Sequence, residues 1–296
     1  MVTRCNAERS LGEEMETEEM NHTDFQFLRS AIWSLSGITL SDAKKHLIQS
    51  RLRSRLQTLG MECFSEYRTL LERLPPGHPE WQEFTNSLTT NKTDWFREPS
   101  HFDFMLKEFI PRWSQLKKRD TQRKRLKLWS AACSTGEEPY TIAMILARAC
   151  EHGAIGSHQI LATDIDTEVL KRAAKGIYLK SALNQIPPDY HRSAFIPGTG
   201  EISHLIKMRS QLKQNVTFRR YNLTQTPCPW SGEFDIIFCR NVFIYFSKDV
   251  IAKVIDSLYR AAAKDAILLI GHSESLQGAS KWRYVGPSIY VKGGMF

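Results

Sequence analysis

The sequence lacks any apolar run that approaches the roughly 20 residues needed to cross a membrane. Its N-terminus also lacks the apolar segment of a secretory signal peptide. The six cysteines form neither a Cys-x-x-Cys pair nor a spacing typical of metal ligands. We therefore expect a cytoplasmic protein with reduced thiols, no metal and no membrane insertion.

Charge and length set broad limits on what the protein does. A chain of 296 residues is long enough for two domains, and its net charge of +8 indicates an acidic partner or surface. Nucleic acid, an acidic protein and an anionic membrane are all compatible with this charge. Residues 1–21 carry six glutamates and few large apolar groups, which is typical of a disordered acidic tail.

The segment 22–90 has apolar residues at helical spacing, interrupted by glycine and proline. It is expected to form an all-α N-terminal domain of four helices. In the second helix basic residues lie beside the apolar stripe, and we consider two interpretations, a solvated flank or a docking surface for an acidic partner. The basic residues at this spacing are Lys44, Arg51 and Arg55, and Arg53 is a further basic residue of the same helix.

The C-terminal two thirds of the chain contain a distinctive segment at residues 126–140. There an apolar run is followed by a turn of small residues and then by Glu137 and Glu138. This order predicts a strand, a tight turn and the start of a helix. Such a turn is where a doubly wound α/β sheet binds nucleotides, but the Gly-x-Gly-x-x-Gly fingerprint of dinucleotide sites is missing. Two carboxylates would repel a pyrophosphate and would suit a cationic ligand or sugar hydroxyls.

Further alternating strands and helices predict a mostly parallel sheet with an antiparallel hairpin at the end. The second strand ends at Asp164, the position from which an acid binds ribose hydroxyls in such folds, and Asp166 is expected to cap the next helix. Residues 176–215 are irregular and resemble an insertion of short strands. Residues 117–127 hold seven basic groups and one acidic group, as expected of an exposed loop.

Residues 91–99 connect the two parts of the chain and mix amide, hydroxyl, aromatic, guanidinium and carboxylate groups. Linkers rarely need such a mixture, so this linker is a candidate part of the active site. The alternative is a capped turn in which Pro99 begins the next helix.

Four motifs in order carry a resemblance to a known family. They are Asn91-x-Thr93-x-x-Phe96-Arg97-Glu98, Ser134-Thr135-Gly136-Glu137-Glu138-Pro139-Tyr140, Ala162-Thr163-Asp164-Ile165-Asp166 and Cys239-Arg240-Asn241-Val242-x-Ile244-Tyr245-Phe246. Together with Gly271-His272-Ser273-Glu274-Ser275, they resemble the bacterial chemotaxis receptor glutamate O-methyltransferases, the CheR family. The resemblance covers about residues 24–292.

The resemblance implies a Rossmann-like α/β methyltransferase domain at 100–296, with a small antiparallel β insertion, behind an all-α domain. It implies S-adenosyl-L-methionine as methyl donor, S-adenosyl-L-homocysteine as product and receptor glutamates as acceptors. Arg97 and Tyr245 are implied near the reaction centre. The implied cofactor residues are Asn91, Thr93, Arg97, Glu137 or Glu138, Asp164, Asn222, Leu223, Arg240 and Asn241.

The same resemblance implies that the basic second helix guides docking to the acidic cytoplasmic helical bundle of a receptor. In some members the β insertion also holds a peptide at the receptor's C-terminal end, and Gly198-Thr199-Gly200 is similar to that subtype. We expect a monomer. Two alternatives remain: a nucleic-acid methyltransferase, whose usual motifs are missing after the fourth strand, and a non-catalytic cofactor-binding scaffold, although the motif residues are retained.

Overall fold

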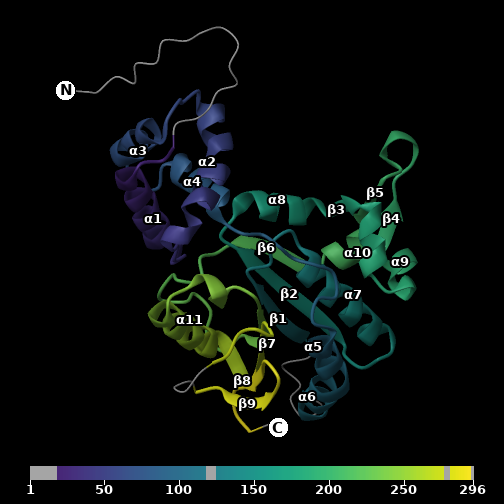
Figure 1. The fold of residues 1–296 in the computed structure, drawn as a ribbon. Coiled ribbons are helices and arrows are strands. Elements are labelled where there is room, and N and C mark those ends of the chain that lie inside the picture. Colours follow the sequence, from purple (N-terminus) through teal and green to yellow (C-terminus); the bar gives the residue numbers. More distant parts are fainter. Residues whose placement is uncertain (1–18, 118–124, 277–280, 295–296) are drawn as a thin grey trace, which may run out of the picture. The chain divides into compact units, whose positions relative to one another are not determined.

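The computed structural model describes residues 19–117, 125–276 and 281–294. Residues 1–18 of the predicted acidic tail and most of the predicted basic loop lie outside these residues, whereas Met20, at the end of the predicted tail, is buried. The chain divides into two compact units (Figure 1), the first containing residues up to 31 together with 40–88, and the second containing 32–39 together with 89–296.

The first unit is all-α, as expected. Its elements are α1 (His22–Ser36), the 3₁₀ turn η1 (Asp42–Lys44), α2 (Lys45–Leu59), α3 (Phe64–Arg73) and α4 (Pro79–Leu88). The apolar stripe of α2 buries Ile48, Leu52 and Leu56. Gly60 ends α2 in the left-handed conformation, which glycine adopts without a Cβ penalty. The last residues of α1 belong to the second unit.

The second unit is built on a seven-stranded sheet with the order β6-β2-β1-β7-β8-β10-β9, which confirms the predicted fold class. The first five strands pair in parallel, and β10 is antiparallel to both of its neighbours. The strands are β1 (Arg125–Ala131), β2 (Ser157–Asp164), β6 (Val216–Arg220), β7 (Phe234–Cys239), β8 (Ala262–Ile270), β9 (Arg283–Gly286) and β10 (Ile289–Val291).

The helices of this unit follow the linker or connect the strands. They are α5 (Pro99–Phe104), the π-helical η2 (Met105–Phe109), α6 (Ile110–Lys117), α7 (Glu137–Glu151), α8 (Thr167–Lys175), α9 (Pro188–Ala194), α10 (Ser210–Lys213) and α11 (Lys248–Ala261). Short 3₁₀ turns lie at η3 (Lys180–Gln185), η4 (Gly200–Ile202) and η5 (Phe243–Tyr245). No helix in the described part of the chain is long and apolar enough to span a membrane.

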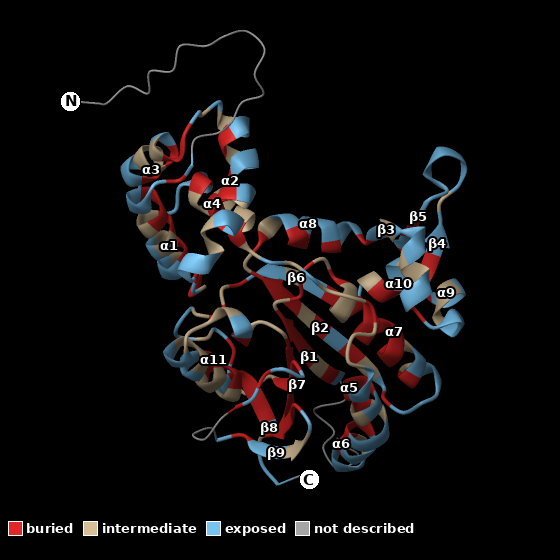
Figure 2. Cartoon of the chain, in the orientation of Figure 1, coloured by how far each residue is buried: buried red, intermediate tan, exposed pale blue. Residues whose placement is uncertain are grey.

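Two apolar clusters cover the two faces of the sheet. Alternate residues of a strand point to opposite faces, so Leu128 joins one cluster and Trp129 the other. The first cluster includes residues of α5, α6 and α7, and the second includes residues of α11. Figure 2 shows the resulting burial along β7 and β8. Burial on both faces fixes the register of the strands and thus the position of their carboxyl ends.

The insertion at 176–215 contains a second, three-stranded antiparallel sheet in the order β3-β5-β4. Its strands are β3 (Ile177–Leu179), β4 (Phe195–Pro197) and β5 (Leu205–Met208). This confirms the predicted β insertion.

Strand order reverses between β1 and β7, because the chain moves from β1 to β2 on one side and later returns to β7 on the other. In open α/β sheets, ligands bind outside the carboxyl ends of the strands at such a switch point. The fold therefore places the candidate site at the carboxyl ends of β1, β2 and β7.

Candidate active site

The turn after β1 follows an unusual backbone path that brings it to the end of β2. Ala132, Ser134 and Gly136 all have positive φ angles. The backbone N–H of Ser134 donates to Asp164 Oδ2 at 2.8 Å, and Cys133 N donates to the carbonyl of Thr163 at 2.9 Å. A Cβ at Gly136 would lie 2.9 Å from the Cβ of Ala173, so both φ and packing require glycine there.

Asp164 and Asp166 have separate tasks at the end of β2. Asp164 is buried and accepts N–H groups from Ser134 and, at 3.0 Å, from Asp166. Burial raises the pKa of Asp164 to about 6, although these backbone donors oppose the rise. Asp166 Oδ1 accepts the N–H groups of Glu168 and Val169, so it caps α8 as expected.

The two acids at the start of α7 face different surroundings. Glu138 accepts the Ser130 hydroxyl at 2.6 Å and pairs with Arg240 Nη1 at 3.2 Å. Burial raises the pKa of Glu138, and Arg240 opposes that shift. Glu137 instead lines a cavity of about 420 Å³ together with Thr93 and Tyr178. The geometry therefore distinguishes two acids that the sequence leaves equivalent.

The linker is fastened to the carboxyl ends of the strands. The second carboxylate oxygen of Asp166 accepts Thr89 Oγ1 at 2.7 Å and Asn91 Nδ2 at 2.8 Å. The Ser134 hydroxyl donates to the carbonyl of Asn91 at 2.8 Å. Thus Asn91 is held by residues that follow β1 and β2.

Arg240 fixes the far end of the linker. Its side chain is 2% exposed, and its Nε lies 3.1 Å from Glu98 Oε2 while Nη1 pairs with Glu138. Its Nη2 donates to the backbone carbonyl of Arg97. Arg97 itself is half-buried, and its Nη1 lies 3.4 Å from the carbonyl of Lys92. Arg240 therefore connects the end of β7, the start of α7 and the linker.

The turn after β7 is held in place by the carboxylate of Glu274. Glu274 accepts N–H groups from Asn241 at 2.9 Å, Phe243 at 2.8 Å and Gly271 at 2.7 Å. Asn241 has a φ of 57°, and Tyr245 follows in η5. A Cβ at Gly271 would lie 2.4 Å from Asn241 Nδ2, so this close approach needs glycine.

The Asn222 side chain is occupied by local structure. It donates to the carbonyl of Leu35 at 2.8 Å and accepts from the backbone and hydroxyl of Thr224. It therefore holds the end of α1 against the loop after β6. The adjacent Leu223 is buried.

The basic residues of α2 and η1 belong to the first unit, where two of them have internal roles. Arg55 forms a two-pronged ion pair with the buried Glu80, and Arg51 Nη1 donates to the carbonyl of Leu88 at 2.7 Å. Lys44 is half-buried and lies in η1 rather than in α2. Arg53 is the exposed member of the set.

Sequence reasoning missed the structural roles of Glu98, Glu274, Ser134 and Leu35. Glu98 and Glu274 stand inside the quoted motifs, which was a usable signal, but their partners lie far away along the chain. Leu35 contributes only a backbone carbonyl, for which a sequence carries no signal.

A doubly wound sheet with a buried acid at the end of β2, two acids at the start of the helix after β1 and no glycine-rich dinucleotide turn is typical of a Rossmann-like S-adenosyl-L-methionine-dependent methyltransferase. Residues 91–290 match the family described as CheR methyltransferase, SAM binding domain, and residues 23–89 match CheR methyltransferase, all-alpha domain. The chain belongs to the CheR methyltransferase family.

Curated relatives extend over most of the chain. Chemotaxis protein methyltransferase 2 of Pseudomonas aeruginosa is 40% identical over 281 residues, covering 92% of this chain and 95% of the relative. The chemotaxis protein methyltransferase of Escherichia coli is 39% identical, with 88% and 87% covered, and that of Borreliella burgdorferi is 37% identical, with 88% and 91% covered.

The cofactor of this family is S-adenosyl-L-methionine, and the residues present fit it. Asp164 offers a buried acceptor at the end of β2, where two N–H donors fix its position. Glu137 and Thr93 face a cavity beside the turn. Acidic groups match the positive charge of a sulfonium, and no basic side chain donates to Asp164 among the hydrogen bonds of the described residues.

Proposed function

We propose that this enzyme methylates glutamate side chains of chemotaxis receptors and forms glutamate 5-O-methyl esters and S-adenosyl-L-homocysteine. The observation that carries the proposal is the linker, which Asp166 and Arg240 hold against the strand ends. This fixed course supports a shared site for Thr93, Arg97 and the acids after β1 and β2. The glutamate methyl ester would tune the sensitivity of the receptor during adaptation.

In this proposal Asp164 binds the ribose hydroxyls, and Glu137 rather than Glu138 faces the cofactor, because Arg240 and Ser130 occupy Glu138. Asn91, Thr93 and Leu223 border the site. Arg240, Asn241 and Asn222 act mainly by positioning the linker, the turn after β7 and the loop after β6. The bound cofactor supplies an electrophilic methyl group.

Arg97 is proposed to orient the acceptor carboxylate. A glutamate side chain with an ordinary pKa of about 4.3 is already ionised near pH 7, so no general base is required. Orientation then dominates, and good alignment contributes up to roughly 7 to 11 kcal/mol. The guanidinium of Arg97 matches a carboxylate, and one contact leaves the second oxygen free to react. Tyr245, in η5, would place its hydroxyl beside the transferred methyl.

Docking to the acidic receptor bundle, in the cytoplasm, is proposed to use the basic surface of the first unit. Arg53 is exposed, whereas Arg55 compensates the buried Glu80. Reversing the charge of Arg55 would therefore perturb folding as well as docking. Arg53 is the residue whose reversal separates the two effects.

A second receptor contact is proposed at the β insertion. Ile177, Leu179 and Ile196 are exposed on the two outer strands, β3 and β4. An outer strand with exposed apolar side chains can add an extended peptide as a further strand. A C-terminal receptor peptide would fit this mode, and the tethered enzyme would act as a monomer.

The decisive assay is incubation with methyl-labelled cofactor and receptor-containing membranes. Alkali should release the label as methanol, because a carboxyl methyl ester is labile to base. Label that resists alkali would place the methyl on nitrogen or carbon and would reject the proposal. Label recovered in nucleic acid would support the alternative of a nucleic-acid methyltransferase.

A further inference from the structure

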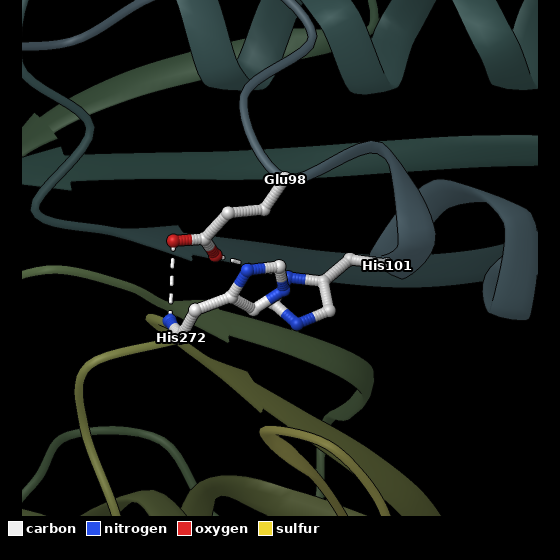
Figure 3. Close-up of side chains that lie close together, drawn as sticks. All are labelled: Glu98, His101 and His272. Atoms are coloured by element: carbon white, nitrogen blue, oxygen red, sulfur yellow. Dashed lines mark hydrogen bonds and ion pairs between the residues drawn. The ribbon is translucent and has the colours of Figure 1, made fainter.

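Three potential metal ligands that are distant in sequence lie together at the end of the linker. Figure 3 shows Glu98, His101 on α5, and His272 in the loop after β8. One ligand atom from each residue lies within 4.8 Å of the others. The backbone N–H of His272 also donates to Glu98 Oε1 at 3.1 Å and so fixes the position of the carboxylate.

His101 is fully buried beside the carboxylate of Glu98. Its Nδ1 lies 3.4 Å from Glu98 Oε2. Neither ring nitrogen makes a well-formed hydrogen bond within the described residues. A neutral imidazole carries an N–H on one nitrogen and a lone pair on the other, so the buried ring of His101 leaves one donor and one acceptor unsatisfied. Such a buried, unsatisfied polar atom requires an explanation, and a bound cation supplies one.

The distance between His101 Nδ1 and Glu98 Oε2 suits two ligands of the same ion. Zinc-type ions bind imidazole nitrogen and carboxylate oxygen at about 2.0 to 2.2 Å, so two ligands at a tetrahedral angle lie roughly 3.4 Å apart. The observed separation is 3.4 Å. The His272 ring lies with its centroid 5.0 Å from that of His101, and one of its ring nitrogens lies within 4.8 Å of the other two ligand atoms.

Charge and access also permit an ion. Glu98 and Glu138 carry two negative charges against the single positive charge of Arg240, which contacts the same Glu98 oxygen at 3.1 Å. A carboxylate oxygen has two lone pairs, so one can accept Arg240 while the other faces the ion. His272 is exposed and borders a cavity of about 210 Å³ together with Ser100.

We propose that Glu98, His101 and His272 bind one divalent transition-metal ion of the zinc type. Two imidazoles and one carboxylate are a ligand set that such ions prefer, whereas Mg²⁺ and Ca²⁺ prefer oxygen ligands. The ion would join the residue beside Arg97 to the loop after β8 and would stiffen the end of the linker. The proposal does not rest on the identity of the methyl acceptor.

The test uses the full-length protein after treatment with a chelator. Equilibrium dialysis against Zn²⁺ should give one tightly bound ion per chain and a raised melting temperature, and Mg²⁺ should do neither. His272→Ala and His101→Ala should each weaken Zn²⁺ binding at least tenfold. His204→Ala, which removes another exposed imidazole, is the matched control and should change nothing.

Co²⁺ provides a separate readout, because its absorption reports its ligands. A tetrahedral visible band without a near-ultraviolet thiolate band is expected, and His272→Ala should abolish it. Unchanged Zn²⁺ binding in His272→Ala, or a thiolate band with Co²⁺, would overturn the proposal. Zn²⁺ binding no tighter than that of single histidines on a protein surface would overturn it as well. Because His272 is exposed, its variant should fold even if His101→Ala does not.

Discussion

Replacing Arg240 by methionine should strongly destabilise the second unit. The side chain is 2% exposed and serves two carboxylates, whose side chains are 10% and 14% exposed, as well as the carbonyl of Arg97. Removing one partner of a buried ion pair typically costs about 3 to 5 kcal/mol, because the remaining charge is uncompensated. For a unit of this size, that loss corresponds to a fall in melting temperature of roughly 10 °C.

The assay is urea and thermal unfolding followed by circular dichroism. Arg260→Met is the matched control, because Arg260 is 64% exposed and its pair with Asp256 should be worth less than about 0.5 kcal/mol. Adding Glu98→Gln and Glu138→Gln to Arg240→Met should recover at least half of the loss, since no buried carboxylate then lacks a counter-charge. If Arg240→Met lowered the free energy of unfolding no more than the control does, the stabilising role of the Arg240 contacts would be refuted.

Three further predictions concern other parts of the site and its docking surface. The pKa of Asp164 is raised to about 6, above the unfolded value of about 3.9, so this group favours the folded state at low pH and loses that contribution as pH rises through 6. Cofactor binding should have the opposite pH dependence, because it uses the ionised carboxylate. The affinity measured by calorimetry should fall about tenfold from pH 7.5 to 5, and Asp164→Asn should lose this dependence; a wild-type affinity that changes no more with pH than that of Asp164→Asn would disprove this role. Gly271→Ala should cost about 1 to 3 kcal/mol of unfolding free energy because its Cβ would displace Asn241 or Glu274, whereas Gly294→Ala, with nothing within 4 Å, should be neutral; equal effects would refute the close-approach argument. Arg53→Glu should lower the rate of receptor methylation while leaving cofactor affinity and melting temperature unchanged, and an unchanged rate would remove Arg53 from the docking surface.

The strands of the sheet and some of the helix ends could be predicted because their signals are local. Apolar runs ending at Ala131 and Asp164 mark buried parallel strands, and Gly60 marks the end of a helix. The cap at Asp166 also follows from its place before the helix, and the structure confirms it. The insertion at 176–215 was visible from its irregular composition.

The side-chain partners could not be predicted, because they join segments far apart in the chain. Arg240 meets Glu98 across 142 positions, and Asn222 meets Leu35 across 187. Spacing on a helix likewise placed Arg55 beside an apolar stripe but could not reveal that Glu80 neutralises it. Only the packed fold separates Glu137, beside a cavity, from Glu138, beside Arg240.

The most direct test of the whole account is a crystal structure of this protein with S-adenosyl-L-homocysteine. We predict that the ligand lies over the carboxyl ends of β1 and β2, with its ribose hydroxyls on Asp164, and that Glu137, Thr93 and Arg97 contact its homocysteine part. A ligand that touched Asp164 but no linker residue, or that bound away from these strand ends, would contradict the account.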